Sequence, residues 1–370
     1  MQFKKGGNNM SIQDKLSVAI PRELTGSDIY RRYQFQIACA MELIVRMASA
    51  EKEFIALMDY LDDIVLIENP NNEEAFITFY QVKSKESGNF TINTILKKEW
   101  IDKMYYNLNL FEGERVKSVF LSNTGIKFDK NHIINSFEIV SLKEYLDAEK
   151  LQKFDNSIIT SISKSLKLSK DKIDYKGIYV AKTMLTLDDY DRQIKGELQS
   201  MAAAICPSLS AVSLDTIFIK LREMLSVRQA YPYVIKAGEN SYEMVYDKKG
   251  FSAKQFREII QVTKDVQLPE IKEITEFIKS LNIETNENKL AFANHYRKFS
   301  EEIVLHNASL TSKIFAILDV YMEEILKLEN DKLFKFCIEK LEMSDIKSTL
   351  FYSENKELLV ILYLYKRSGN

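Results

Sequence analysis

The spacing of apolar residues changes along the first third of the chain and predicts a succession of different elements. Between Tyr30 and Glu51 apolar side chains recur with roughly the 3.6-residue period of a helix. Two runs rich in Ile, Val, Phe and Tyr follow, LMDYLDDIVLIE and EEAFITFYQVKSK. The Asn/Pro cluster at residues 69–72 between these runs is typical of a hairpin turn.

The next segments predict how this hairpin is covered. Both runs are largely apolar on both faces, which favours strands with helices on each side. NTILKKEWIDKMYYNLN has helical spacing, and VKSVFLSNTG is typical of a short buried strand that ends in a turn. The order helix, hairpin, helix, strand therefore predicts an α/β core whose last two strands are joined by a crossover helix.

The rest of the chain becomes increasingly helical. FEIVSL and GIYVAKTML could be further strands, separated by a lysine-rich helical stretch around residues 150–172. From about Leu185 the spacing is helical almost throughout, with one small hairpin expected in YPYVIKAGENSYEMVY. We expect a flexible segment at residues 1–20, an α/β domain with a mixed sheet at 21–210, and a mostly α-helical domain at 211–370 for partner binding or oligomerisation.

Polar side chains gather at one end of the predicted hairpin. Gln81 and Lys83 share a face of the second strand, and Asp63 lies on an otherwise apolar face of the first. One register places Asp63 opposite Tyr80, one step from Gln81. A shift by one position places it opposite Gln81, with Lys83 on the diagonal. Either register brings an acid, an amide and a lysine together at one end of a buried sheet.

These side chains suit the hydrolysis of a phosphodiester. That reaction requires a cation that holds a non-bridging oxygen and lowers the pKa of an attacking water. Mg²⁺ prefers hard oxygen ligands and keeps several waters. Asp63 would supply a carboxylate to Mg²⁺ or Mn²⁺, and either the Gln81 side-chain oxygen or the Val82 carbonyl would be a further ligand. Lys83 would orient the water and balance the charge that builds on the phosphate.

The same residues carry a family resemblance. The pattern Asp63, Gln81, Lys83 resembles the Q-x-K variant of the PD-(D/E)xK nuclease superfamily. In order and spacing, the chain also resembles the double-stranded DNA endonuclease domain of bacterial antiphage effectors, found in CBASS nucleases and in the nuclease subunit of Lamassu systems. The resemblance covers roughly residues 20–210 and rests on four segments: PRELTGSDIYRRYQFQ, DDIV, FYQVKSK and VFLSNTG.

The resemblance implies a metal-dependent endonuclease that acts on double-stranded DNA with these three residues at its active site. Gln81 stands where the superfamily often has Glu, which removes one negative charge from the metal site. The helical C-terminal half is unlike the cyclic-nucleotide sensor of the CBASS proteins. It fits better with a Lamassu-type subunit that an SMC-like ATPase and an accessory subunit hold inactive until triggered.

Several residues keep two interpretations. Glu42 lies on the first helix, where the superfamily often supplies another acid, yet Arg46 four residues on could simply pair with it. Lys85 could contact DNA or be a solvated edge-strand lysine. Gln36 and Arg32 match the resemblance, but a role at the helix start explains them as well. The rival function is a non-catalytic adaptor that binds DNA or protein without cutting.

The composition of the chain excludes some classes of protein and site. Hydrophobic residues make up 46% and charged residues 28% of the chain, which excludes a disordered polycation. Three scattered Cys and three scattered His disfavour a zinc site, and no glycine-rich phosphate loop occurs. No apolar run is long enough to span a membrane, so we expect a cytoplasmic protein. A chain with a net charge of −2 cannot bind DNA tightly through overall electrostatic attraction. Several copies or a companion subunit are therefore expected.

Overall fold

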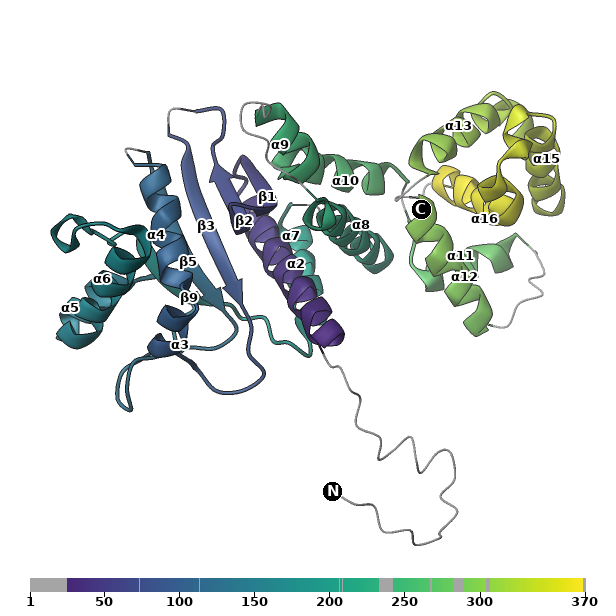
Figure 1. Ribbon diagram of the computed structural model, residues 1–370. Helices are drawn as coiled ribbons and strands as arrows, with labels where there is room; N and C mark the ends of the chain where they lie inside the picture. The colour runs from purple at the N-terminus through teal and green to yellow at the C-terminus, as the bar shows by residue number, and fades with distance from the viewer. Residues whose placement is uncertain are drawn as a thin grey trace, which may run out of the picture.

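The computed structural model describes residues 25–72, 74–112, 114–205, 207, 209–232, 242–266, 268–281, 289–303 and 307–368. Within this part of the chain, the N-terminal region is a mixed sheet flanked by helices and the C-terminal region is mostly helical (Figure 1). The fold class predicted from the sequence is therefore confirmed. The expected flexible segment at residues 1–20 lies outside the described residues.

The main sheet determines where polar side chains can meet. Its strands are β1 (Phe54–Tyr60), β2 (Asp62–Glu68), β3 (Phe76–Lys83), β5 (Val116–Ser122), β8 (Val140–Ser141), β9 (Ile178–Lys182) and β10 (Gly250–Ser252). Across the described residues their order is β10-β1-β2-β3-β5-β9-β8. β3, β5 and β9 are parallel, whereas β1 and β2 form an antiparallel meander with β3. The carboxyl ends of β3, β5 and β9 therefore lie at the same edge as the start of β2.

The run LMDYLDDIVLIE contains a turn, so the prediction that it forms one strand is wrong. β1 and β2 pair with each other, Tyr60 lies opposite Asp62, and Leu61 alone connects them with a φ of 63°. Leu61 therefore lies in a turn and does not share a strand face with Asp63. The turn escapes a pattern search because both strands are largely buried and Leu is not a usual turn residue. It makes Asp62 and Asp63 the first residues of β2.

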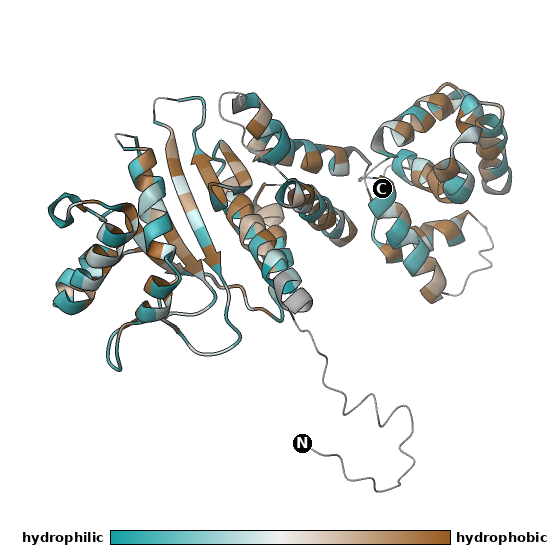
Figure 2. Ribbon diagram, in the orientation of Figure 1, coloured by the Kyte–Doolittle hydropathy of each residue, from teal (hydrophilic) through white to brown (hydrophobic). Residues whose placement is uncertain are grey.

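Helices cover both faces of the sheet, as the apolar character of the strands predicts (Figure 2). α2 (Thr25–Ser49) lies over one face, and its buried residues share a hydrophobic core with Tyr80 and Val82 of β3. The other face packs against a second set of helices: α3 (Ile92–Lys97), α4 (Trp100–Leu110), α5 (Leu142–Ala148) and α6 (Gln152–Leu166). α3 and α4 were expected to be one helix, but Glu99 separates them with a φ of 56°.

Small additions complete this part of the fold. β4 (Phe90–Thr91), β6 (Ile126–Lys127) and β7 (Ile133–Ile134) form a separate short sheet. η1 (Lys170–Lys172) is a single 3-10 turn after α6. α7 (Tyr190–Ile205) follows β9 and packs against α2.

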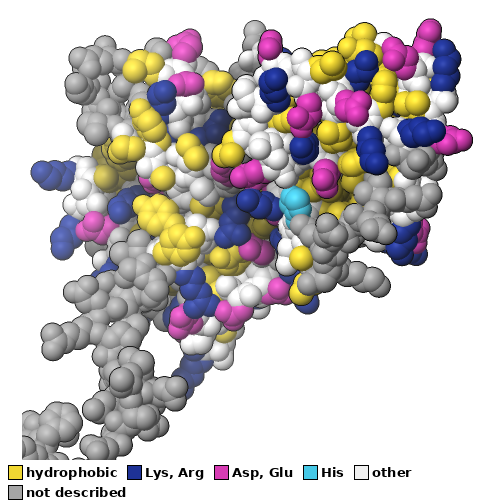
Figure 3. Space-filling model, turned by 90° about the vertical axis from the view of Figure 1, so that its right-hand side faces the viewer, with side chains coloured by type: hydrophobic (Ala, Val, Ile, Leu, Met, Phe, Trp, Pro, Cys, Tyr) yellow, Lys and Arg dark blue, Asp and Glu magenta, His cyan; other side chains and the backbone are white. Residues whose placement is uncertain are grey.

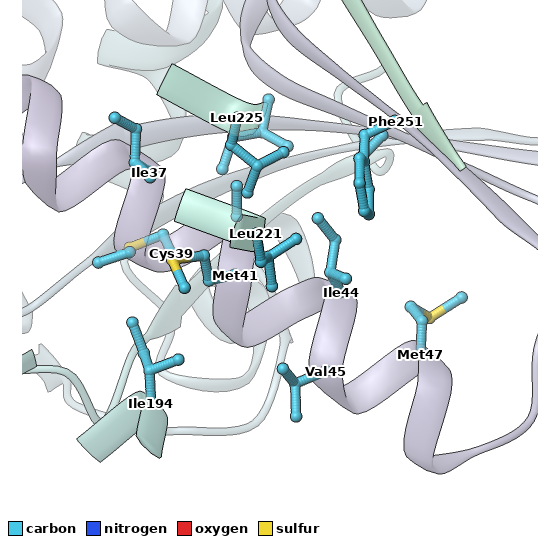
Figure 4. Packing of buried hydrophobic residues seen from close by; sticks show 14 of the residues in the cluster. Ile37, Cys39, Met41, Ile44, Val45, Met47, Ile194, Leu221, Leu225 and Phe251 are labelled. Carbon is cyan, nitrogen blue, oxygen red and sulfur yellow. The ribbon is translucent and has the colours of Figure 1, made fainter. Parts of the chain in front are cut away.

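Residues beyond 210 also contribute to the sheet and its core. α8 (Ala211–Ala230) packs against α2, and β10 pairs with β1 in the register Ala56↔Phe251. Figure 4 shows Leu221, Leu225 and Phe251 packed against side chains of α2. α10 (Ala253–Val266) belongs to the same core. A domain division at residue 210 stays a prediction, and this packing favours grouping α8 to α10 with the sheet.

The hairpin expected within residues 231–246 is not found where the chain is described. Residues 233–241 lie outside the described residues, and α9 (Tyr242–Lys249) is helical from its first residue. The strand β10 follows α9 directly and ends at Ser252. Because α9 has mixed charge and no clear apolar face, its spacing gave no helical signal.

The last hundred residues form a helical unit with a core of its own. Its described elements are α11 (Ile271–Ser280), α12 (Lys289–Glu302), α13 (Ala308–Asp319), α14 (Met322–Ile325), α15 (Asn330–Glu342), η3 (Asp345–Ser348) and α16 (Leu350–Arg367). α16 is the most buried of them, with Leu358 to Leu364 all within the core. Figure 3 looks onto this side of the molecule and shows positive and negative side chains interspersed. No helix in the described ranges has both the length and the apolar character that crossing a bilayer requires.

Candidate active site at the ends of β2 and β3

The start of β2 and the end of β3 bring the three candidate residues into contact. The two strands pair with Ile64 opposite Tyr80, so the next position along places Asp63 opposite Gln81. This is the second of the two registers that the sequence allowed. Val82 N–H donates to Asp63 Oδ2 at 2.7 Å. Because strand N–H groups point along the sheet, this bond places Asp63 Oδ2 close to the plane of the sheet, and the Asp63 side chain is 16% exposed.

The two oxygens of Asp63 have unequal surroundings. Oδ2 accepts from Gln81 Nε2 at 2.6 Å and from Lys83 Nζ at 2.7 Å, in addition to the Val82 N–H. Oδ1 accepts from Gln36 Nε2 on α2 at 2.9 Å. Three donors leave Oδ2 little room for another ligand, whereas Oδ1 keeps an available lone pair.

Lys83 is held by two groups of opposite character. Its ammonium forms the 2.7 Å ion pair with Asp63 and lies 5.6 Å from the centre of the Trp100 ring at the start of α4. The Lys83 side chain is 21% exposed. An ammonium between a carboxylate and an aromatic face is fixed in position but still open to a substrate.

Asp62 is a second carboxylate at this edge. It accepts from Asn107 Nδ2 of α4 at 3.1 Å and from the Asp63 N–H at 2.9 Å. Burial, and next the negative charge of Asp63, raise the pKa of Asp62 to about 7. Burial and a neighbouring carboxylate therefore disfavour the ionised form of Asp62 at this edge of the sheet.

Two cavities are lined by Asp63 or by its hydrogen-bond partners. The first, of about 480 Å³, is mainly acidic and is lined by Asp59, Asp62, Asp63, Gln81, Glu99, Asp102, Lys103 and Tyr106, among others. The second, of about 540 Å³, is mainly basic and is lined by Arg32, Gln36, Val82, Lys83, Lys85, Lys98 and Trp100, among others. Asp63 and Gln81 therefore border the acidic cavity, and Lys83 borders the basic one.

A model of the family described as Cap4, dsDNA endonuclease domain, matches residues 24–228, more than half of the 370 residues. The chain belongs to the Cap4 dsDNA endonuclease domain family. No curated protein and no solved structure gives a significant match. The Cap4 match confirms the resemblance to an antiphage endonuclease domain, and the Lamassu assignment and the PD-(D/E)xK subtype stay predictions.

The residues at this edge of the Cap4 domain fit a divalent cation with hard oxygen ligands. Asp62, Asp63 and the Gln81 amide all border one cavity, and the raised pKa of Asp62 reflects burial and negative charge that a cation would offset. A carbonyl in a strand points to the same side as its own N–H, so we expect the Val82 carbonyl on the side of the strand where its N–H meets Asp63. The described residues contain no group of three or more His, Cys, Asp and Glu side chains arranged to hold a metal. The amide, the carbonyl and waters would therefore have to complete the coordination.

Glu42 and Lys85 are not brought to Asp63. Glu42 is 3% exposed and accepts from Arg46 and from the Thr183 hydroxyl, each at 2.6 Å, so both of its oxygens are bonded. Burial raises the pKa of Glu42. Lys85 Nζ donates to the Asn89 carbonyl at 2.9 Å. A metal-binding role for Glu42 and a substrate role for Lys85 stay predictions.

Other contacts of the Cap4 site have little signal in the sequence. Nothing in the sequence pattern indicates that Asn107 contacts Asp62 or that Trp100 lies beside Lys83. Gln36 belongs to the segment that carries the resemblance, but its contact with Asp63 spans 27 residues. Gln229, which donates to Gln36, is a further 193 residues away. Only the folded sheet brings these side chains together.

Proposed function

We propose that this chain is a metal-dependent endonuclease that cuts double-stranded DNA as an effector of bacterial antiphage defence. Membership in the Cap4 dsDNA endonuclease domain family supports the substrate class. The observation that carries the proposal is the convergence of Gln81 and Lys83 on one carboxylate, Asp63, which lines the acidic cavity while Lys83 lines the basic one.

Asp63, Gln81 and Val82 would hold the cation, Mg²⁺ or Mn²⁺. When bound, it supplies positive charge at a non-bridging phosphate oxygen and lowers the pKa of water. Asp63 offers Oδ1, its less occupied oxygen, and Gln81 can turn its amide to present Oε1. Lys83 keeps its ammonium beside the reacting phosphate, where it stabilises the negative charge that develops during cleavage.

The basic cavity supports a position for the DNA backbone. Arg32, Lys85 and Lys98 border it together with Lys83, and phosphate contacts of this kind position a duplex without reading its sequence. The acidic cavity on the other side of Asp63 repels phosphates unless a cation is present. DNA would therefore follow the basic side and meet the metal at Asp63.

A requirement for other subunits is part of the proposal. The net charge of −2 gives the chain no overall attraction to DNA, and Figure 3 shows positive and negative side chains interspersed on the side of the C-terminal helices. We propose that the C-terminal helices bind an SMC-like ATPase and an accessory subunit of a Lamassu-type system. This complex would keep the cytoplasmic nuclease inactive, and homo-oligomerisation on activation would provide several DNA-binding sites.

Cleavage of supercoiled plasmid in Mg²⁺ by the full chain tests the chemistry. Lys83→Ala and Asp63→Asn should abolish nicking, while Lys254→Ala, an exposed lysine of α10, should cut as the unchanged chain does. Equal cleavage by Lys83→Ala and the unchanged chain would refute the role of Lys83. If the unchanged chain does not cut DNA and neither variant alters antiphage protection, the chain is a non-catalytic adaptor.

A further inference from the structure

The orientation of the Asp63 carboxylate depends on an amide chain that begins on a distant helix. An ionised carboxylate only accepts hydrogen bonds, so Gln36 must turn its NH₂ group toward Asp63 Oδ1. The Gln36 carbonyl oxygen then faces away from Asp63 and must find a donor. Gln229 Nε2 is that donor, at 2.7 Å.

Gln229 therefore fixes which way the Gln36 amide faces. If Gln36 turned over, its carbonyl oxygen would face Asp63 and its NH₂ group would face that of Gln229. Both contacts would be repulsive. Gln36 is the sole donor to Oδ1 among the described residues, whereas Oδ2 has three donors. Gln36 thus fixes the position of Oδ1 in addition to the three donors that hold Oδ2, and Gln229 supports the orientation of Gln36.

The structure around Gln229 restricts its movement. Gln229 is 3% exposed at the end of α8, whose Leu221 and Leu225 are fully buried beside α2 (Figure 4). Its backbone carbonyl faces the buried Lys249 ammonium at 3.5 Å. Its own Oε1 is buried without a hydrogen-bond partner in the described residues. A buried amide oxygen without a hydrogen bond costs free energy. The need to pair its own polar atoms therefore does not explain why the Gln229 amide donates in this direction.

We propose that Gln36 and Gln229 are positioning residues that hold Asp63 with Oδ1 available to the catalytic cation. Neither residue has to touch the cation or the DNA for this role. The inference rests on the proposed function, because it assigns a role to the partners of a metal-binding carboxylate. Outer partners of metal ligands typically change metal affinity by about 10- to 100-fold when they are removed.

The test is a double-mutant cycle in the full chain with Gln36→Met and Gln229→Met, which keep side-chain length and remove the amide. One readout is the dissociation constant of Mn²⁺ for the DNA-free protein, from the dependence of its melting temperature on metal concentration. The other is the Mg²⁺ concentration that gives half-maximal plasmid cleavage. Each single variant should raise both values about tenfold. The double variant should match Gln36→Met, because Gln229 acts through Gln36.

Gln229→Glu provides an opposite perturbation. Its carboxylate would attract the NH₂ group of Gln36 and turn the Gln36 carbonyl toward Asp63. It should therefore weaken Mn²⁺ binding more than Gln229→Met does, and this difference should vanish in the Gln36→Met background. If Gln229→Met proves too unstable to measure, Gln229→Asn keeps the amide but withdraws it by one methylene, and the same loss is expected.

Losses that multiply in the double variant would overturn the inference, as would lower melting temperatures with unchanged Mn²⁺ affinity. Lys83→Ala separates this outcome from a failure of the proposed function. If Lys83→Ala cuts DNA normally, the assignment of the proposed function to this site fails, and the Mn²⁺ series still decides whether the two glutamines orient Asp63. If Lys83→Ala is inactive and the glutamine variants bind Mn²⁺ normally, only the positioning role is refuted.

Discussion

Lys83 Nζ lies 2.7 Å from Asp63 Oδ2, although Lys85, two residues along, has its ammonium on the Asn89 carbonyl. Changing each lysine to Met should therefore affect a different step, cleavage for Lys83 and DNA binding for Lys85. Lys83→Met is expected to lower the rate constant for cleavage about 10²- to 10³-fold, the usual effect of losing one group that stabilises transition-state charge. Lys85→Met should weaken DNA binding and leave that rate constant unchanged. Single-turnover cleavage at saturating enzyme separates the two effects, and equal rate losses would contradict this assignment.

Lys98 borders the basic cavity and has no part in holding Asp63. Lys98→Ala should weaken binding to DNA of any sequence, because a phosphate contact positions the duplex without reading bases. The slope of log affinity against log salt should fall by about one. Fluorescence anisotropy with a labelled duplex at several salt concentrations measures both quantities, with Lys254→Ala as the control. An unchanged slope would mean that Lys98 does not contact a DNA phosphate.

Asp62 should make the stability of the metal-free protein depend on pH. Its pKa is about 7 in the folded chain, against an ordinary value of 3.8. Between these values the folded state keeps a proton that the unfolded state has lost, so stability falls as pH rises, by at most about 1.4 kcal/mol per pH unit. Above pH 7 Asp62 is ionised in both states, and the free-energy cost of its ionisation in the folded chain stays constant. Below pH 4 Asp62 is protonated in both states and this cost disappears.

Asp62→Asn cannot titrate, so its stability should fall less steeply than that of the unchanged chain between pH 4 and pH 7. Urea unfolding in the presence of a chelator, at four pH values, gives the comparison. The slope of the unfolding free energy against pH is the informative quantity. Asn accepts fewer hydrogen bonds than Asp, which shifts the unfolding free energy by the same amount at every pH. Parallel curves would mean that Asp62 is ionised across this range.

Glu42 provides a test of the two interpretations that its sequence context allowed. Both of its oxygens accept hydrogen bonds, from Arg46 and from Thr183. Glu42→Gln keeps the shape and one acceptor, so we expect DNA cleavage with an unchanged requirement for Mg²⁺. Glu42→Ala should cost about 1–3 kcal/mol of stability, because Thr183 is buried and loses its acceptor. Loss of cleavage by Glu42→Gln without loss of stability would make Glu42 a metal ligand instead.

The division of the chain can be tested by truncation. A chain of residues 25–210 lacks α8, β10 and α10, and leaves α2 without the packing of Leu221, Leu225 and Phe251. We expect it to aggregate or to unfold without a cooperative transition. A chain of residues 25–268 keeps this core and should unfold cooperatively in circular dichroism. Cooperative unfolding of the shorter chain would instead support a domain boundary at residue 210.

The parts of the fold that could be predicted from the sequence are those with a local signal. The β2–β3 pair has β-branched and aromatic residues beside an Asn/Pro turn, and its side-chain alternation already grouped Asp63 with Gln81 and Lys83. The turn leaves the register open by one residue, and only the packing of both faces decides between the two. The β1–β2 turn at Leu61 contains no Gly, Pro or Asn, so its signal in the sequence was weak despite the Asp residues that flank it.

The surroundings of Asp63 could not be predicted in the same way. Gln36 reaches it from a helix that precedes the sheet, and Gln229 reaches Gln36 from a helix 193 residues later. Periodicity predicts that such helices are buried but does not say which of their polar side chains meet. The Asn107 contact with Asp62 likewise depends on where α4 begins, and the break at Glu99 sets that position.

β10 pairs with the outer side of β1 through residues 250–252, almost 200 positions after β1 begins. During translation, the ribosome must therefore synthesise two thirds of the protein before this border of the sheet acquires its partner. A polypeptide released before residue 211 would lack both β10 and α8, the helix that carries Gln229. The outer side of β1 thus stays unpaired with β10 in every nascent chain until the segment after α9 has emerged.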